Sequence, residues 1–168
     1  IMSLKVENIS FYYEDNHILD DISFELERGV YCCLLGSNGV GKSTLFHLIL
    51  KLNESYQGEI FLDGENIQEK SPKEMAEKIA YIPQSHAPIF DYLVKDVVLM
   101  STASSTGLFS SPNKHNEKAA REALYRVGIG HLAEKIYTQI SGGERQLVLI
   151  ARALAQGSEI FIMDEPTS

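Results

Sequence analysis

The feature that most constrains the fold of this chain is the glycine-rich segment 36–43, GSNGVGKS, which fits the pattern G-x-x-x-x-G-K-[S/T]. An apolar run, 31–35, precedes the segment, and residues 42–52 follow it with leucines and isoleucine at helical spacing. This context predicts a buried strand, a tight loop and a helix. A buried strand that is followed at once by a helix is typical of an α/β fold.

The loop itself has a chemistry that its residue types explain. Glycines let the backbone turn so that successive N–H groups converge on phosphate oxygens, and the helix N-terminus adds partial positive charge. Lys42 supplies a full charge for the β and γ phosphates of a nucleotide, and the Ser43 hydroxyl is suited to binding Mg²⁺. The alternative is a glycine-rich turn without a ligand.

The remaining apolar patterns predict the rest of the fold. Alternation in 4–7, 22–27 and 59–63 indicates antiparallel strands, whereas the continuous runs 31–35 and 160–163 indicate a parallel sheet covered by helices. Helices are expected at 42–52, after a capping box formed by Ser71 and Glu74, at 116–127 and at 145–156. The sequence therefore predicts one α/β domain over 1–168, with a mainly parallel core sheet, an antiparallel β part and a helical part at about 85–157.

Two acidic residues end the predicted strand 160–163. Ligands in open α/β sheets bind at the carboxyl ends of strands, and an acid there is unfavourable unless it meets a cation. We expect Asp164 to hold Mg²⁺ and Glu165 to orient the attacking water as a general base. The alternative is a solvated acidic turn.

A second candidate anion site is Ser141-Gly142-Gly143-Glu144, which directly precedes the helix predicted at 145–156. Exposed N–H groups, a hydroxyl and the absence of large side chains would suit phosphate binding there. Because one nucleotide does not need two phosphate clamps, we expect this one to act on a nucleotide held by a partner. A plain helix cap is the alternative.

Three other features are less specific. Gln84 ends the predicted strand 79–83, and Tyr13 is an aromatic residue that either stacks on a base or packs. Cys32 and Cys33 lie in the apolar run 31–35, so we expect two buried thiols without a disulfide between them.

Composition excludes several classes of protein. The net charge is −8, from 15 basic and 23 acidic residues, which disfavours nonspecific binding to nucleic acid or anionic membrane. The sequence has no apolar run of membrane-spanning length and no signal-peptide pattern at its start. A cytoplasmic location is therefore expected.

Together, these segments resemble the nucleotide-binding subunit of an ABC transporter. Residues 36–43 look like a Walker A motif, Gln84 a Q-loop, 141–144 an ABC signature, and Asp164 with Glu165 a Walker B motif with its catalytic Glu. The resemblance spans essentially the whole chain. Residues 96–100, the Ser-rich loop after them and 128–133 are similar to importers of metal chelates such as iron–siderophore, vitamin B12 and molybdate.

The resemblance implies a P-loop NTPase fold of the ABC type with ATP and Mg²⁺ as cofactors. It implies metal ligation by Ser43, Gln84 and Asp164, and catalysis by Glu165 with Lys42 and Gln84. It implies ATP contacts from the following residues: Tyr13, Gly36, Ser37, Asn38, Gly39, Val40, Gly41, Lys42, Ser43, Thr44, Ser141, Gly142, Gly143 and Glu144.

The resemblance also implies partners. Two subunits would form a head-to-tail dimer, and integral membrane permease subunits would dock near 84–100, which places the protein on the cytoplasmic face of the membrane. ATP hydrolysis would power transport, most simply import of a metal chelate. No nucleic-acid partner is expected.

One departure from the family pattern lies after Ser168, where the family continues through a D-loop, two further strands and a switch His. We therefore expect a truncated subunit that lacks its C-terminal strands and has an unpaired sheet edge. Two alternatives to a transport ATPase stay open. One is an ABC ATPase that acts on chromosomes, DNA repair or ribosomes, and the other is a nucleotide-binding fragment without turnover.

Overall fold

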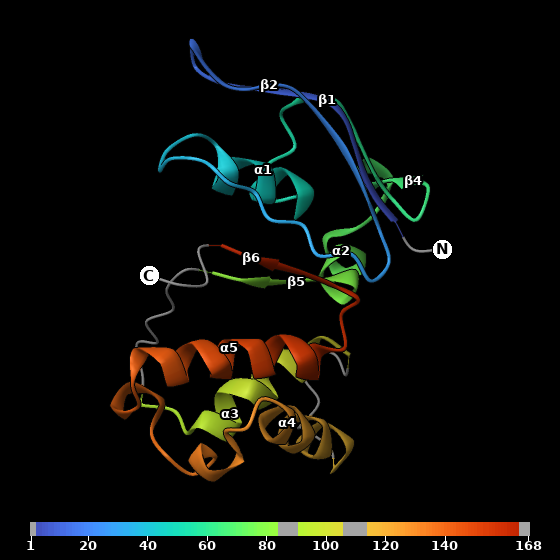
Figure 1. The fold of residues 1–168 in the computed structure, drawn as a ribbon. Coiled ribbons are helices and arrows are strands. Elements are labelled where there is room, and N and C mark those ends of the chain that lie inside the picture. Colours follow the sequence, from blue (N-terminus) through green and yellow to red (C-terminus); the bar gives the residue numbers. More distant parts are fainter. Residues whose placement is uncertain (1–2, 84–90, 106–113, 165–168) are drawn as a thin grey trace. The chain divides into compact units, whose positions relative to one another are not determined.

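The computed structural model describes residues 3–83, 91–105 and 114–164. The chain forms two compact units, Ile1–Met75 and Ala76–Ser168. Each unit has its own sheet, and each is described by itself (Figure 1).

The first unit is built on a four-stranded sheet in the order β2-β1-β3-β4. Its strands are β1 (Ser3–Tyr13), β2 (Asn16–Glu27), β3 (Gln57–Leu62) and β4 (Glu65–Asn66), and all of their pairings are antiparallel. The helix α1 (Lys42–Ile49) lies between β2 and β3 in the chain, and a 3₁₀ turn, Ile67–Glu69, follows β4. The predicted antiparallel strands are thus confirmed, because their alternating apolar residues bury one face of this sheet.

The second unit contains a two-stranded parallel sheet and a group of helices. Its strands are β5 (Ile79–Ile82) and β6 (Ile160–Met163), paired from Ile79–Ile160 to Ile82–Met163. The helices are α3 (Val94–Leu99), α4 (Lys114–Arg126) and α5 (Gly142–Gln156), with 3₁₀ turns at Met100–Ser105, Gly130–Leu132 and Tyr137–Gln139. The helix α2 (Pro72–Lys78) lies at the junction of the two units in the chain.

The helix α5 lies between the two-stranded sheet and the helices α3 and α4 of the second unit (Figure 1). It is apolar on both of these sides. Val148 and Ala151 pack in the core shared with α3 and α4, whereas Leu149 and Ala153 pack against Ala80 and Ile82 of β5. A helix that is buried on both sides needs apolar residues around most of its circumference, and the sequence of α5 provides them.

Helix ends follow the predicted chemistry. The Ser71 hydroxyl accepts a hydrogen bond from the Glu74 N–H at 3.2 Å while the Glu74 carboxylate accepts one from the Ser71 N–H at 2.7 Å, so the expected capping box of α2 is present. At the C-terminal end of α5, Gly157 adopts a φ of 79°. This left-handed conformation favours glycine and terminates the helix.

One expected strand is wrong. Residues 31–35 are in no strand, and Tyr31 is 101% and Leu35 89% exposed. The two cysteines, expected to be buried, are exposed. The reason is that β structure needs a neighbouring strand for its backbone N–H and C=O groups, and no described strand pairs with this run. Apolar composition alone did not determine its structure.

None of the helices in the described ranges combines the length and the apolar character that crossing a membrane requires.

Candidate functional site

The predicted phosphate-binding loop lies directly before α1 in the first unit. The Val40 N–H donates a hydrogen bond to the Ser37 carbonyl at 3.3 Å, which closes a turn in the loop. Gly39 and Gly41 have φ angles of 81° and 102°, values that L-residues with a Cβ rarely adopt. The two glycines therefore allow a backbone path that brings the loop back onto the start of α1.

The side chain of Lys42 points into this loop. Its Nζ donates hydrogen bonds to the carbonyl oxygens of Gly36 at 2.7 Å and Ser37 at 3.0 Å. The ammonium group is therefore held at the loop by two neutral acceptors, and it forms no ion pair with any other residue that the structure describes. A phosphate oxygen is a stronger partner for this cation than a carbonyl oxygen.

The N-terminus of α1 has no side-chain cap. Gly41, the N-cap residue, has no side chain to accept a hydrogen bond from the first N–H groups of the helix, and the first turn contains no acidic residue. Helix N-termini attract anions through these N–H groups and the helix dipole. Ser43 is exposed in this turn and Thr44 is half-buried beside it.

The start of α1 packs closely on β2. A Cβ added to Gly41 would lie 3.0 Å from Leu19 Cδ2 and 3.1 Å from both Ile18 Cγ2 and the Ile18 carbonyl oxygen. The glycine is therefore required for close approach as well as for its φ angle. The antiparallel sheet thereby positions the loop.

Tyr13 lies at the end of β1, where the β1–β2 hairpin turns. It pairs with Asn16 across the hairpin and its side chain is 66% exposed. An exposed ring of this kind is available for stacking on a base, and it is not part of the core.

The predicted second anion site begins α5 and is occupied by a capping box. The Ser141 hydroxyl accepts from the Glu144 N–H at 3.3 Å, and the Glu144 carboxylate accepts from the Ser141 N–H at 2.7 Å. Hydrogen bonds from the Ser141 backbone and side chain lower the pKa of Glu144 below its ordinary value. Gly142 and Gly143 are exposed, and a Cβ at either position would meet no atom within 4 Å.

The two helix N-termini thus differ. The capping box at α5 already uses two of the groups that were expected to bind phosphate, whereas α1 has no such cap. The N–H groups of Gly142 and Gly143 are what α5 can offer a ligand, because the Ser141 hydroxyl already donates its proton to the Glu144 carboxylate.

Asp164 lies at the carboxyl end of β6, as predicted, and is buried. Its N–H donates to the Ile82 carbonyl at 3.0 Å, which continues the parallel ladder, and its Oδ2 accepts a hydrogen bond from the Tyr81 hydroxyl at 3.4 Å. Desolvation and the neighbouring Asp164 carboxylate raise the pKa of Tyr81. Tyr81 was not identified from the sequence, although its place beside Asp164 follows from the pairing of β5 with β6.

The expected site residues fall into separate parts of the structure. The loop and Tyr13 belong to the first unit, whereas Asp164 and residues 141–144 belong to the second. Gln84 and Glu165 lie outside the described residues. Within the described ranges, no three His, Cys, Asp or Glu side chains gather in a group that would hold a metal ion.

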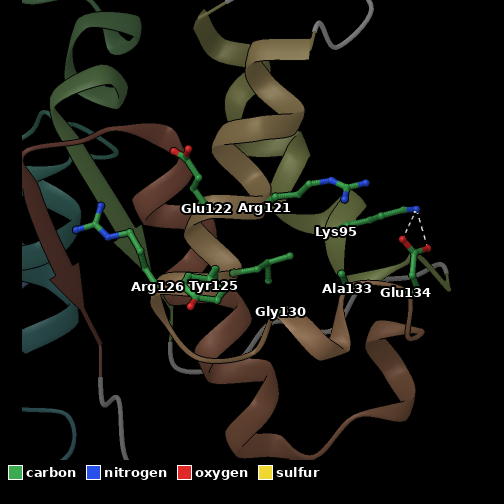
Figure 2. A pocket seen from close by; sticks show the side chains of 9 residues that line it. Lys95, Arg121, Glu122, Tyr125, Arg126, Gly130, Ala133 and Glu134 are labelled. Carbon is green, nitrogen blue, oxygen red and sulfur yellow. Dashed lines mark hydrogen bonds and ion pairs between the residues drawn. The ribbon is translucent and has the colours of Figure 1, made fainter.

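A groove of about 660 Å³ lies on the second unit, along α3, α4 and the turn after α4 (Figure 2). Lys95 pairs with Glu134 at 2.7 Å at one side of it. Tyr125 is 83% exposed, and its Cα lies 3.9 Å from the position of a Cβ on Gly130. Lys95 is part of the predicted docking stretch 84–100. The α4 residues were not identified from the sequence, in which their signal is an aromatic side chain on an otherwise polar helix face.

Comparison with known proteins identifies the family. The sequence matches the family profile described as ABC transporter over residues 19–168. An uncharacterised ABC transporter ATP-binding protein of Haemophilus influenzae is 44% identical over 168 residues, which are 100% of this chain and 64% of that protein. The molybdate import ATP-binding protein MolC of the same organism is 38% identical over 167 residues, which are 99% of this chain and 61% of that protein.

The fold has solved relatives as well. One solved structure shows an inward-facing conformation of a protein assigned to the metal-chelate type of ABC transporter. It superimposes on this chain with a TM-score of 0.86 at 36% sequence identity, and the match covers 99% of this chain and 62% of that one. The chain thus spans less than two thirds of the length of each of these relatives. It belongs to the ABC transporter family and has the fold of its ATP-binding cassette.

Proposed function

We propose that this protein is the ATP-binding and ATP-hydrolysing subunit that powers an ABC transporter, and that the transporter imports a metal chelate such as an iron–siderophore. The observation that carries the proposal is the loop before α1. There, the Lys42 ammonium is held on two carbonyl oxygens beside a helix N-terminus that has no side-chain cap and no acidic residue in its first turn. This combination suits the triphosphate of a nucleotide.

Binding of ATP would change the partners of Lys42. Its Nζ would leave the carbonyls of Gly36 and Ser37 for the β and γ phosphates, and the N–H groups of residues 39–44 would donate to the same oxygens. Tyr13 would stack on the adenine. The site would then contact both ends of the nucleotide from one unit of the chain.

The residues suited to Mg²⁺ are Ser43, Asp164 and Gln84. Ser43 is exposed in the first turn of α1, and Asp164 ends β6 with its carboxylate hydrogen-bonded by Tyr81, so both offer oxygen ligands of the type that this cation prefers. When bound, Mg²⁺ neutralises charge that develops on the phosphates. Glu165 would orient the attacking water and accept its proton.

The N-terminus of α5 would contact ATP held by a second copy. No Cβ shields the N–H groups of Gly142 and Gly143. The Ser141 hydroxyl would turn from the Glu144 carboxylate to donate its proton to the phosphate. We assign Glu144 the role of holding the helix N-terminus in place, because its carboxylate accepts a hydrogen bond from the Ser141 N–H and would repel a phosphate at close range. Two subunits would therefore sandwich two ATP molecules head to tail.

Import of a metal chelate is supported by the relatives. One is a molybdate import protein and one solved neighbour is assigned to the metal-chelate type. Such a subunit would work on the cytoplasmic face of the membrane, attached to permease subunits.

We place the permease contact at the groove on the second unit, as an extension of the predicted stretch 84–100. Arg121 and Arg126 line it and make no ion pair with another described residue, whereas Lys95 is paired with Glu134. Unpaired cations around an exposed Tyr125 suit an acidic segment of a membrane subunit. Figure 2 shows Arg121 extended on the side of Lys95.

Charge reversal tests this contact. We expect Arg121→Glu with Arg126→Glu to abolish co-purification with the membrane subunits. Lys114→Glu, at the start of the same helix and outside the groove, is the control and should leave the co-purification intact. Equal co-purification of the double variant would place the contact elsewhere.

The proposed function itself is tested by Glu165→Gln in the assembled transporter. ATP binding should persist while phosphate release and transport stop. Glu159→Gln is the matched control, because Glu159 lies before the other end of β6 and pairs with Lys78 at 3.1 Å on the surface. Unchanged turnover in Glu165→Gln would remove Glu165 from its proposed role.

A further inference from the structure

The end of the β1–β2 hairpin carries an aromatic pair that the proposed function does not use. The rings of Tyr12 and His17 are stacked with their centroids 4.2 Å apart and an interplanar angle of 4°. The two residues face each other across the hairpin, one pair before the turn, and the next pair is Tyr13 with Asn16. The stack thus lies next to the residue that is expected to contact adenine.

A β-bulge in β2 determines on which face of the sheet each side chain of the hairpin end lies. The pairing passes from Phe11–Leu19 directly to Tyr12–His17, so Ile18 is an extra residue in β2. Phe11 and Leu19 are buried and Tyr12 is exposed on the opposite face. Successive residues of a strand alternate between faces, so Tyr13 shares the face of Phe11.

That face is the one that meets the phosphate loop. The side chains of Ile18 and Leu19 both lie within 3.1 Å of the position of a Cβ on Gly41. Tyr13 therefore projects from the sheet on the same side as the start of α1, whereas Tyr12 and His17 lie on the other side. A slip of one residue at this point would move Tyr13 to the wrong face.

The hairpin end has fewer neighbouring strands than the rest of the sheet. β2 is the edge strand of the sheet, and the pairing of β1 with β3 ends at Ser10–Gln57. Beyond Ser10, the hairpin is two-stranded, and an isolated two-stranded hairpin is only marginally stable. The turn also contains Glu14 at a φ of 53°, a left-handed conformation without glycine to favour it.

We propose that Tyr12 and His17 are positioning residues, whose stacked rings lock the hairpin register so that Tyr13 faces the phosphate loop and can stack on an adenine base. The proposal rests on the proposed function, because it concerns the nucleotide site. Tyr12 and His17 do not touch the nucleotide in this account. They act through Tyr13.

The test compares two probes with the purified protein: ATP, which has a base, and inorganic tripolyphosphate, which has only the phosphates. We expect Tyr12→Leu and His17→Leu each to weaken ATP affinity about two- to tenfold, the range of an aromatic pair, and to leave tripolyphosphate affinity unchanged. Tyr12→Phe keeps the ring and should bind both probes as the wild type does. Unchanged tripolyphosphate binding also shows that the variants are folded.

A double-mutant cycle then separates positioning from a general effect. Tyr13→Ala should lose the preference for ATP, and adding Tyr12→Leu to it should cause no further loss. The proposal is overturned if Tyr12→Leu keeps the full preference for ATP, or if its effect adds to that of Tyr13→Ala. If the wild type binds neither probe, the proposed function fails first, and the positioning proposal fails with it.

Discussion

The close approach of the phosphate loop to the backbone of β2 gives the sharpest prediction, the cost of Gly41→Ala. Alanine at a φ of 102° costs about 1–3 kcal/mol in backbone strain. Its methyl group would also lie 3.0–3.1 Å from two side-chain carbons and the Ile18 carbonyl oxygen. The side-chain ends can shift, but the carbonyl belongs to the backbone of β2, so overpacking adds about 1–3 kcal/mol.

Gly39→Ala is the matched control. Gly39 has a φ of 81°, but a Cβ there would meet nothing within 4 Å. Strain alone should cost about 1–2 kcal/mol. The free energy of unfolding, measured by urea denaturation followed by circular dichroism, should therefore fall further in Gly41→Ala, by about 1–3 kcal/mol. Equal losses in the two variants would refute the close packing of the loop on β2.

Two further predictions concern the capping boxes of α2 and α5. Ser141→Ala and Ser71→Ala should each reduce the free energy of unfolding by about 1 kcal/mol, the usual contribution of an N-cap. Only Ser141→Ala should also weaken ATP-dependent dimerisation, measured by analytical ultracentrifugation. Hydrogen bonds from Ser71 and Ser141 lower the pKa of Glu74 and of Glu144 from 4.5. Each ionised carboxylate therefore stabilises the folded protein fully above that pH, and this stabilisation is lost as the pH falls through the lower folded-state pKa. An acid titration of stability should show this loss, and Glu74→Gln with Glu144→Gln should reduce its size.

Much of the fold was predictable because the signals are local. The capping boxes, the glycine that ends α5 and the alternating strands of the first sheet depend on neighbours in the chain, and the structure has them. The same holds for the loop before α1, whose glycines are required by its φ angles.

The predictions failed where the outcome depends on distant partners. The run 31–35 has strand-forming composition, but no described strand pairs with it, so it is exposed and not in a strand. The groove along α4 is also a tertiary feature, because it is lined by residues of α3, α4 and the turn after α4. The stacking of Tyr12 on His17 was the most accessible of the missed features, since two residues between 13 and 16 suggest a hairpin turn.

Nucleotide affinity tests the central claim most directly. Equilibrium dialysis with labelled ATP, with phosphate release followed in the same samples, would compare the wild type, Lys42→Ala and the surface control Lys118→Ala. The account predicts that Lys42→Ala lowers affinity about ten- to a hundredfold, the loss of a charge-assisted contact, and that Lys118→Ala changes nothing. Equal ATP affinity in the wild type and Lys42→Ala would contradict the assignment of the loop before α1 as the phosphate site.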